Sequence, residues 1–425
     1  MTAVLLIGFV VLLCLGFPVA FALGISGFVM MMWIQGTSAL PALPTIIFES
    51  LNSFTLIAIP LFILMGNILV GARISRDIYQ VIRDWFGTWP GGVAVSTVFF
   101  SAGFSAISGS SVATASTIGS VALPEMLNSG YERRFSLGIV AAGGTIGILI
   151  PPSLFMILYG SLTDVSVGKL FIAGILPGLL MSGLFLAYVV AIAWLNGNRG
   201  EQKLPWAQRL ASLRRGFWGM LLPPIILGGI YAGIFTPTEA AAMGVVYSLL
   251  VAFVVKKMTL ADLHPILLNT TKTTVMVFFI IMGAKIFGHT VTMLQLPQQL
   301  IIGLGELGVS PHMFILLIGI LFIFMGDFLE VVSITLITLP IIYPILVAMG
   351  IDPLWFAVIM CIFMEFALIT PPVGLNLFVI QGLLPGSTTG EIFRGTLPFM
   401  GLMALTLILV VAFPSLSTWL PQLMR

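Results

Sequence analysis

A long apolar segment of the chain is interrupted by two consecutive prolines at Gly143-Gly144-Thr145-Ile146-Gly147-Ile148-Leu149-Ile150-Pro151-Pro152-Ser153. Because proline has no N–H, the carbonyls of Gly147 and Ile148 lose the partners that a continuous helix would give them. About 220 residues later, the pattern recurs at Ala367-Leu368-Ile369-Thr370-Pro371-Pro372-Val373-Gly374-Leu375-Asn376, where the carbonyls of Ala367 and Leu368 are freed. The sequence therefore predicts two helices that break within apolar surroundings.

The composition determines the class of protein to which these broken helices belong. Of the 425 residues, 59% are hydrophobic and 8% are charged, whereas soluble domains carry about 25% charged residues. Such a chain cannot cover the surface of a soluble domain, which excludes a soluble enzyme and a disordered protein. The net charge of +2 provides no basic surface for nucleic acid. We therefore expect an all-α polytopic membrane protein.

Apolar runs long enough to cross a bilayer, which takes about 20 residues, recur along the whole chain. We expect ten crossings, at about 2–17, 18–34, 52–71, 135–160, 170–195, 217–235, 237–255, 273–290, 354–384 and 396–418. Two more apolar stretches, about 92–124 and 313–344, cannot be ordinary crossings if the basic segments are all to stay on one side of the membrane.

The distribution of Lys and Arg predicts the orientation, since cytoplasmic loops are rich in both. A topology with both termini outside places fourteen of the basic residues in the cytoplasm. It leaves Lys169 and Arg425 outside and Lys285 within a span. The polar segment 196–215 is the richest in basic residues, whereas 35–51 and 291–312 contain none. We therefore expect two periplasmic termini.

Short motifs recur in the same order in the two halves of the chain. Gly16-Phe17-Pro18 corresponds to Phe235-Thr236-Pro237, and Phe62-Ile63-Leu64-Met65-Gly66 corresponds to Phe279-Ile280-Ile281-Met282-Gly283. We interpret residues 1–200 and 201–425 as two repeats. Each repeat contains five crossings, an odd number, so the second enters the membrane with the opposite orientation. Such an inverted-topology repeat is common among secondary transporters, with binding sites at the repeat interface.

The two extra stretches are expected to form re-entrant helical hairpins. The first has a tip at Ser108-Gly109-Ser110-Ser111, and the second has Gly326-Asp327-Phe328-Leu329-Glu330 at the corresponding place. Non-helical backbone at membrane depth is tolerated where it is buried or lines a cavity. An alternative for the first stretch is close helix packing through small residues. With the hairpins come two discontinuous helices, at about 135–160 and 354–384.

Acidic residues at membrane depth are candidates for binding. A carboxylate there costs about 2.5–3.5 kcal/mol on insertion scales, so Asp327 and Glu330 need partners. We favour Asp327 over Glu330 as the residue that faces substrate; the alternative is a purely structural acid. Glu365 is expected either to support the second break, to pair with Lys285 or simply to pack.

Freed carbonyls at two corresponding breaks suit a hard cation such as sodium. The alternative is a pair of proline kinks whose carbonyls bond to Ser or Thr hydroxyls or to water. A single kink would not favour either interpretation, but two related ones favour ion binding.

Several stretches resemble a known family. Gly229-Ile-Tyr-Ala-Gly-Ile-Phe-Thr-Pro-Thr-Glu-Ala-Ala-Ala-Met-Gly244 resembles a signature of the large membrane (permease) subunit of tripartite ATP-independent periplasmic (TRAP) transporters. Gly16-Phe-Pro-Val-Ala-Phe-Ala-Leu-Gly24, the serine-rich hairpin and Ile150-Pro-Pro-Ser153 are also similar to that family. The resemblance covers essentially the whole chain.

The resemblance implies an elevator-type sodium symporter of the ion-transporter superfamily in the bacterial inner membrane. It further implies a small membrane subunit as partner, a periplasmic binding protein that delivers the organic acid, contact with membrane lipid, and no cofactor besides Na⁺ as coupling ion. One sodium site would comprise Ser105, Ser108, Gly147, Ile150 and Pro152. The other would comprise Gly326, Ala367, Thr370 and Val373. Substrate would lie near Ser108, Ser153 and Asp327.

The sequence thus predicts sodium-coupled import of an organic acid, with sialic acid slightly favoured and a C4-dicarboxylate next. The first alternative is a sodium–dicarboxylate symporter that works without a binding protein. An intramembrane hydrolase using Asp327 and Glu330 would lack a nucleophile–base pair, so we do not expect an enzyme. A passive channel would make no use of paired re-entrant sites.

Overall fold

The computed structural model describes residues 1–197, 200 and 204–424, and the described residues form helices and no strand. The first half contains α1 (Thr2–Cys14), α2 (Val19–Gln35), α3 (Ala39–Leu51), α4 (Ala58–Gly71), α5 (Ile74–Phe86), α6 (Gly92–Ser108), α7 (Ser111–Asn128), α8 (Arg133–Leu149), α9 (Leu154–Thr163) and α10 (Val167–Leu195). The second half contains α11 (Trp206–Met220), α12 (Leu222–Tyr231), α13 (Pro237–Leu250), α14 (Leu260–Met293), α15 (Leu296–Glu306), α16 (Pro311–Gly326), α17 (Val331–Ala348), α18 (Pro353–Leu368), α19 (Leu375–Leu383), α20 (Thr389–Ala412) and α21 (Ser415–Gln422). The predicted all-α class is confirmed.

Seven helical segments of the described chain are long and apolar enough to cross a membrane. They are 19–51, 133–163, 167–195, 237–255, 260–293, 331–348 and 389–412. A bent pair, 55–71 with 74–86, makes an eighth if it is counted as one span. The expectation of a multi-pass membrane protein is confirmed at this level.

Four of the ten predicted crossings correspond to helices too short to cross alone. They include the crossing at 52–71, which is long enough only together with α5, and the broken one at 354–384. The crossing predicted at 2–17 is the 13-residue α1, which stops before Gly16, a residue with a φ of +83°, and Pro18. The crossing predicted at 217–235 is divided between α11 and the 10-residue α12, which ends just before Gly233. Glycine with positive φ and proline both end helices, and apolarity alone did not reveal these stops.

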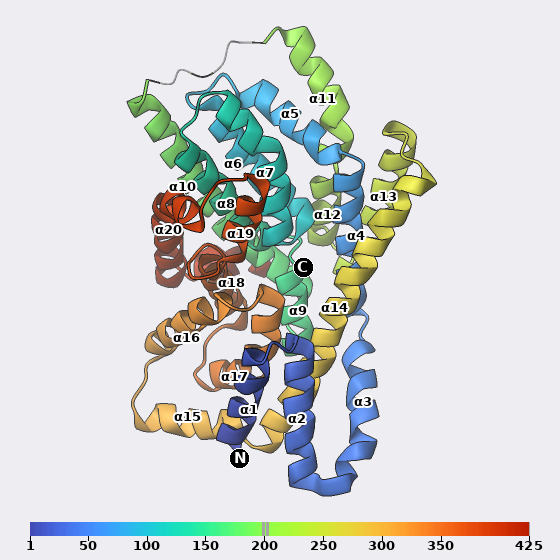
Figure 1. The fold of residues 1–425 in the computed structure, drawn as a ribbon, viewed down its shortest axis with the longest axis vertical. Helices are drawn as coiled ribbons and strands as arrows, with labels where there is room; N and C mark the ends of the chain where they lie inside the picture. Colours follow the sequence, from blue (N-terminus) through green and yellow to red (C-terminus); the bar gives the residue numbers. More distant parts are fainter. Residues whose placement is uncertain (198–199, 201–203, 425) are drawn as a thin grey trace.

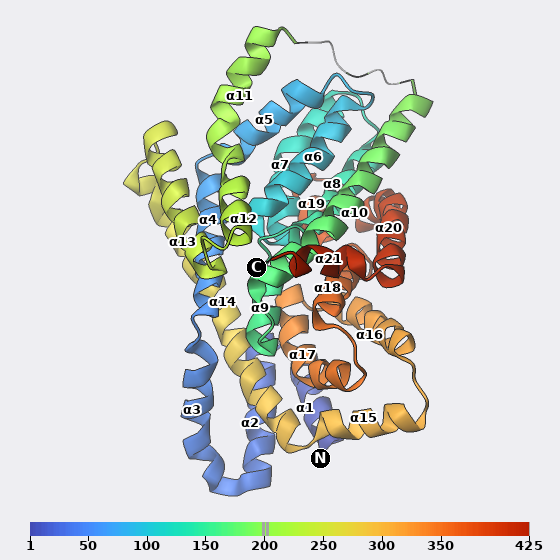
Figure 2. The same cartoon turned by 180° about the vertical axis from the view of Figure 1, so that it is seen from behind.

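Segments that the sequence analysis placed between crossings are largely helical. Residues 35–51 contain α3, which lies beside α2 in both views, and residues 291–312 contain α15 (Figures 1 and 2). The crossing predicted at 273–290 belongs to the 34-residue α14. Of the basic residues predicted on the cytoplasmic side, Arg199 and Lys203 lie outside the described residues, as does Arg425, which was predicted to lie outside the cell.

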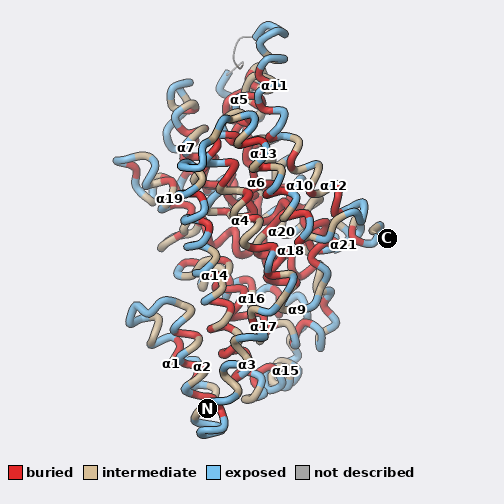
Figure 3. The backbone as a smooth tube through the Cα atoms, turned by 90° about the vertical axis from the view of Figure 1, so that its right-hand side faces the viewer, coloured by how far each residue is buried: buried red, intermediate tan, exposed pale blue. Residues whose placement is uncertain are grey.

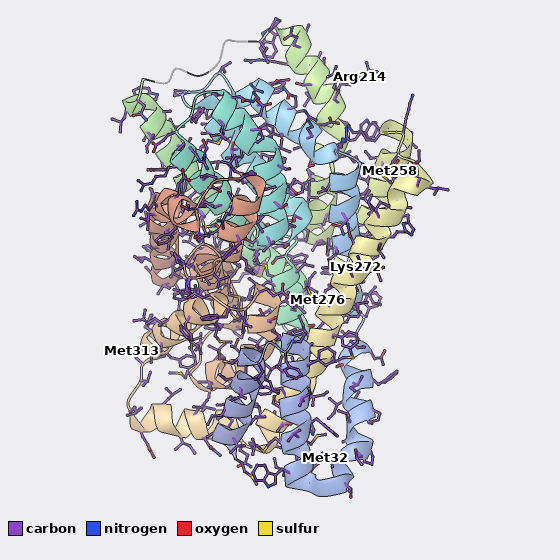
Figure 4. The ribbon with its side chains drawn as sticks, viewed as in Figure 1. Met32, Arg214, Met258, Lys272, Met276 and Met313 are labelled. Atoms are coloured by element: carbon purple, nitrogen blue, oxygen red, sulfur yellow. The ribbon has the colours of Figure 1, made fainter. Side chains whose placement is uncertain are left out.

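The helices fall into two groups that lie side by side (Figure 1). One group, to the right in that view, contains α2, α3, α4, α12, α13 and α14. The other contains the predicted hairpins and broken helices, α6 to α9 and α16 to α19, together with α10 and α20. Behind them, α21 lies against α10 and α18 (Figure 2). Figure 4 places Met32 and Arg214 toward opposite ends of the molecule.

The broken helices occupy the centre of the fold. Every residue of α8 from Ser136 to Leu149 is buried, as is every residue of α18 from Trp355 to Leu368. Buried residues lie along the middle of the molecule and exposed residues along its sides (Figure 3). Because lipid-facing helices expose part of their surface, α8 and α18 are enclosed by protein.

Glycines allow the closest helix contacts. A Cβ added at Gly138 in α8 would lie 2.1 Å from the carbonyl oxygen of Gly395 in α20. In the other group, a Cβ at Gly283 in α14 would lie 2.2 Å from the carbonyl oxygen of Ala20 in α2. Small residues at such crossings let membrane helices pack backbone to backbone, which supplies the van der Waals contact that holds them together.

Candidate functional site

The serine-rich stretch forms the turn between α6 and α7. Helix α6 ends at Ser108, Gly109 adopts a φ of +64°, and Ser110 caps the start of α7 by accepting a hydrogen bond from the amide of Ala113 (3.5 Å). Glycine adopts this left-handed conformation without steric cost. Small residues thus let the chain reverse within two residues between two helices that pack on each other.

This tip contacts the first break. Helix α8 ends at Leu149 and α9 begins at Leu154, on either side of the cis peptide Pro151–Pro152. The carbonyl of Gly109 accepts a hydrogen bond from the amide of Leu154 (3.2 Å), and a Cβ at Gly109 would lie 2.7 Å from the carbonyl oxygen of Pro152. The first hairpin therefore supplies a partner to backbone that the prolines leave outside a helix.

Most of the residues predicted for the first sodium site lie around this contact. Gly147 faces the hairpin, since a Cβ there would lie 2.8 Å from Thr114 Oγ1 and 3.1 Å from the carbonyl oxygen of Ser110. Ser108 donates its hydroxyl to the carbonyl of Ser110 (3.3 Å). Ser105 is one turn away, with its carbonyl accepting from the amide of Gly109 (3.2 Å). Among the described residues, none donates to the carbonyl of Gly147 or Ile148.

The second break has a different hydrogen-bonding pattern. The carbonyl of Ala367 accepts from the amide of Thr370 (3.3 Å), so our expectation that proline leaves it free is wrong. A tight final turn supplies a donor from three residues on, in place of the one that Pro371 lacks. The Thr370 hydroxyl donates to the carbonyl of Phe366 (2.6 Å). Val373 lies in the irregular segment between α18 and α19.

The second hairpin packs directly on this break. Helix α16 ends at Gly326 and α17 begins at Val331. A Cβ at Gly326 would lie 2.2 Å from the Cβ of Ala367, so only glycine permits this approach. The residues predicted for the second sodium site are thus brought together at Gly326 and Ala367, with Thr370 and Val373 following in the chain.

The three residues predicted for substrate do not share one cavity. Asp327 is 7% exposed, and its Oδ1 has no hydrogen-bond partner within the described chain. Ser153 is fully buried and caps α9 by accepting from the amide of Met156 (3.4 Å). A cavity of about 50 Å³ separates the two hairpin tips, and it is lined by Glu330 instead of Asp327. It also contacts Gly109, Ser110, Ser111, Val112, Leu154 and Phe155.

This cavity is the meeting point of both hairpins and both broken helices, since Ile148, Val331, Val332 and Leu368 complete its lining. Its volume accommodates one or two waters. Because the cavity is this small, an organic acid bound there would need the hairpin tips to move apart. The sequence favours Asp327 as the acid that faces substrate. Because Glu330 lines this cavity, Glu330 is also a candidate.

Glu365 contacts the first half of the chain and not Lys285. Its Oε2 lies 3.1 Å from the hydroxyl of Ser111. Lys285 instead lines a separate cavity of about 320 Å³ with Glu49 and His289. The expected pairing of Glu365 with Lys285 is therefore wrong, because α18 is buried beside α8 while Lys285 is on α14.

Asn376, at the start of α19, also contacts the first half of the chain. Its Nδ2 donates to Ser111 Oγ (2.9 Å) and to the carbonyl of Ala141 (3.5 Å). The sequence pattern predicts no role for Asn376, which lies in the second proline stretch, and none for Thr114. The signal available in the sequence was an amide side chain within an apolar stretch, shortly after the second proline pair.

Comparisons with known proteins identify the family of the chain. A family model described as the DctM component of the tripartite ATP-independent periplasmic transporter matches residues 6–416. The chain is 41% identical over 402 residues to the C4-dicarboxylate TRAP transporter large permease protein DctM of Pseudomonas aeruginosa, covering 94% of each. It is 34% identical over 422 residues to the sialic acid TRAP transporter large permease protein SiaM of Vibrio cholerae, covering 98% of this chain and 97% of that one.

The fold is also found in a solved structure. The Alcanivorax borkumensis YdaH transporter superposes with a TM-score of 0.65 over 91% of each chain, at 14% identity. This likeness supports the architecture alone. The family model and the relatives, by contrast, extend over nearly the whole sequence and confirm the resemblance. The chain belongs to the DctM family, the large permease component of tripartite ATP-independent periplasmic transporters.

Proposed function

We propose that this permease imports an organic acid by sodium-coupled symport with an elevator mechanism. The observation that carries the proposal is the pairing of each hairpin tip with a broken helix at the buried centre of the fold. Gly109 meets Pro152 in one pair, and Gly326 meets Ala367 in the other. Discontinuous helices with paired ion sites are a recurring design of secondary transporters.

Sodium is proposed at each pairing. In the first, the unpartnered carbonyls of Gly147 and Ile148 support an ion held with Ser105, Ser108, Ile150 and Pro152. In the second, Gly326, Ala367, Thr370 and Val373 would contribute, with the carbonyl of Leu368 as a further ligand because no described residue donates to it. Backbone oxygens of this kind suit a hard monovalent cation.

The elevator proposal divides the molecule into a moving unit and a fixed scaffold. The moving unit would comprise residues 92–160 and 313–384, two inverted repeats that pack on each other through α7 with α19, α8 with α18, and α9 with α17. Backbone at the breaks cannot face lipid, because its unpaired polar groups would lose all hydrogen bonding. The hairpin tips must therefore stay with the breaks, which favours movement as one body.

The organic acid is proposed to be a C4-dicarboxylate, with sialic acid second. This order reverses the slight preference from the sequence, because identity to a relative named for C4-dicarboxylates is 41% and to one named for sialic acid is 34%. A periplasmic binding protein would deliver the substrate, and a small membrane subunit would complete the scaffold. The positive-inside distribution supports periplasmic termini in the bacterial inner membrane.

The sodium gradient supplies enough free energy to accumulate the organic acid. One charge crossing 100 mV contributes about 2.3 kcal/mol, and a tenfold gradient contributes about 1.4 kcal/mol. Two sodium ions accompanying a doubly charged acid cancel its charge, so about 3 kcal/mol from the concentration gradient remains to drive accumulation. A third sodium would add the membrane potential to the driving force.

The proposal is tested by uptake into proteoliposomes that contain the permease with its small subunit. We expect accumulation of radiolabelled dicarboxylate when an inward sodium gradient and the loaded binding protein are both present. Replacing sodium by potassium outside should reduce accumulation to the level of empty liposomes.

Two outcomes would redirect the interpretation. Equal uptake in potassium would contradict sodium coupling. Uptake of free acid without the binding protein would favour the alternative sodium–dicarboxylate symporter. Offering sialic acid with its own binding protein in a parallel assay separates the two substrate classes.

A further prediction concerns Asp327, whose Oδ1 lacks a partner. An organic acid brings its own negative charge, so Asp327 should accept from a substrate hydroxyl, amide or ammonium group, with Ser108 or Ser153 nearer the carboxylate. Asp327→Asn keeps the shape and should weaken apparent substrate affinity by about one to two powers of ten, because a lost hydrogen bond to a charged group costs about 1.5–3 kcal/mol.

The matched control is Glu306→Gln, an exposed acid at the end of α15. It should leave the apparent affinity unchanged. Wild-type rate and affinity in a well-folded Asp327→Asn variant would make Asp327 structural and leave Glu330 as the acid at the site.

A further inference from the structure

Three buried oxygen atoms near the junction of the two halves lack hydrogen-bond partners within the described chain. They are Oε1 of Glu365, Oδ1 of Asn376 and Oγ1 of Thr114. All three side chains are 0% exposed. Buried polar atoms without partners are uncommon, and each signals a missing group.

The three residues are held in one neighbourhood by Ser111. Its hydroxyl lies 3.1 Å from Glu365 Oε2, 2.9 Å from Asn376 Nδ2 and 3.0 Å from the carbonyl oxygen of Gly144. Thr114 follows Ser111 by three residues on α7, which places it on the same face of the helix. It contacts Gly147, three residues after Gly144 on α8. The three unpartnered oxygens thus lie near the short stretch in which α7 and α8 face each other.

The cluster has more acceptors than donors. Ser111 has one proton, yet both Glu365 and the Gly144 carbonyl lie within reach of it. The Asn376 amide already donates to Ser111 and to the Ala141 carbonyl. The unpartnered oxygen atoms of this cluster therefore lack a group that carries positive charge or a proton to donate.

No basic side chain among the described residues fills this need. The ion pairs of the described chain join Arg83 with Glu125, Arg133 with Glu391, and Lys256 with Asp77, so none involves Glu365. An isolated carboxylate this deeply buried costs far more than a paired one. A small cation from solution would compensate Glu365 and the unpartnered oxygens of Asn376 and Thr114 together.

We propose that Glu365, Asn376 and Thr114 bind a third sodium ion, through Oε1, Oδ1 and Oγ1. This inference rests on the proposed function. A single carboxylate with neutral oxygens fits a monovalent hard cation, whereas calcium takes six to eight oxygens and usually several carboxylates. The site differs from the two proposed above because it has a charged ligand and because it joins the first hairpin to the second broken helix.

The ion would bind the halves of the moving unit together. Thr114 belongs to α7, Glu365 to α18 and Asn376 to α19. Sodium in this position connects three helices from two repeats through one centre. Its absence would leave Glu365 uncompensated and weaken the contact of Ser111 with the second half.

The test counts sodium ions in the purified permease with its small subunit. Equilibrium binding of ²²Na⁺ in detergent gives the number of ions per complex without requiring transport. We expect Glu365→Gln to bind one ion fewer than the wild type. Thr114→Val, which keeps the volume, should weaken the affinity of one ion by roughly tenfold, the factor that corresponds to 1.4 kcal/mol.

The matched control is Cys361→Ala, one turn earlier on α18 and equally buried. It should keep every ion and so exclude a general packing effect. Size-exclusion profiles show whether each variant is folded, and Thr114→Val carries the test if Glu365→Gln is not.

The outcomes separate this inference from the proposed function. A wild-type complex that binds no sodium would contradict the proposed function itself. Sodium binding with the same number and affinity in the wild type, Glu365→Gln and Thr114→Val would overturn only the third site, and Glu365 would then hold a proton or a water. One ion fewer in Glu365→Gln, with an intact control, supports it.

Discussion

A disulfide between cysteines introduced at Gly288 and Pro340 should stop transport completely, and reduction should restore it. Gly288 is on α14, which belongs to the proposed scaffold, and Pro340 is on α17, which belongs to the proposed moving unit. A Cβ at Gly288 would lie 3.3 Å from the Cβ of Pro340. That separation is close to the roughly 3.5–4.5 Å found in disulfides. An elevator must slide these helices past each other, so a covalent link there prevents the cycle.

The measurement is substrate uptake by proteoliposomes before and after reduction, in a background where exposed Cys14 is replaced by serine. The matched control is the pair Ser101→Cys with Gly143→Cys. A Cβ at Gly143 also lies 3.3 Å from the partner Cβ, but both positions belong to the moving unit. This control disulfide should leave transport intact. Full transport with the Gly288–Pro340 link verified by mass spectrometry would rule out the elevator.

Gly138→Val should prevent the permease from folding into a monodisperse complex. The added Cβ would lie 2.1 Å from the carbonyl oxygen of Gly395 and 2.7 Å from its Cα. These are backbone atoms, which cannot rotate away as a side chain can. Overpacking usually costs about 1–3 kcal/mol and occasionally more. Here α8 is enclosed by protein from Ser136 to Leu149 and cannot move aside, so the cost falls at or above the upper end.

Gly401→Val is the control on α20, because a Cβ at Gly401 meets no atom within 4 Å. Gly401→Val changes helix propensity in the same way as Gly138→Val, but its side chain does not clash with a neighbouring backbone. Fluorescence-detected size exclusion and thermal melting in detergent measure both variants. A monodisperse Gly138→Val complex with the wild-type melting temperature would contradict the proposed importance of this contact.

The turns and breaks of this fold were predictable from the sequence because their causes are local. Pro151 and Pro371 remove hydrogen bonds wherever they occur, and the small residues around Gly109 permit a reversal regardless of distant packing. The predicted site at Gly147 followed from the same chemistry and from the family resemblance, whereas the one at Gly326 followed from the resemblance alone. Helices α6, α8 and α18 end shortly before Gly109, Pro151 and Pro371, respectively.

The contacts between halves were not predictable. Whether Glu365 meets Ser111 or Lys285 depends on which faces of α18 and α14 turn inward. In a membrane protein both lipid-facing and core-facing surfaces are apolar, so hydrophobic periodicity does not distinguish them. For the same reason, α3 and α15 could not be recognised as packed helices. Ala367 was mispredicted because its carbonyl accepts from the amide of Thr370, three residues on, in place of the donor that Pro371 lacks.

The length of α14 has a consequence for the membrane around the protein. Its 34 residues span about 51 Å, against a hydrocarbon thickness of roughly 30 Å. It packs along α2, α4 and α17 over much of the height of the molecule (Figure 1). Its first part carries Asp262 and His264 and its apolar part continues beyond Lys272 to Met293, so the polar end can lie outside the hydrocarbon while tilt fits the apolar part to the bilayer. Bilayers that differ in thickness should therefore change the tilt of α14 while preserving the surface along which α17 lies.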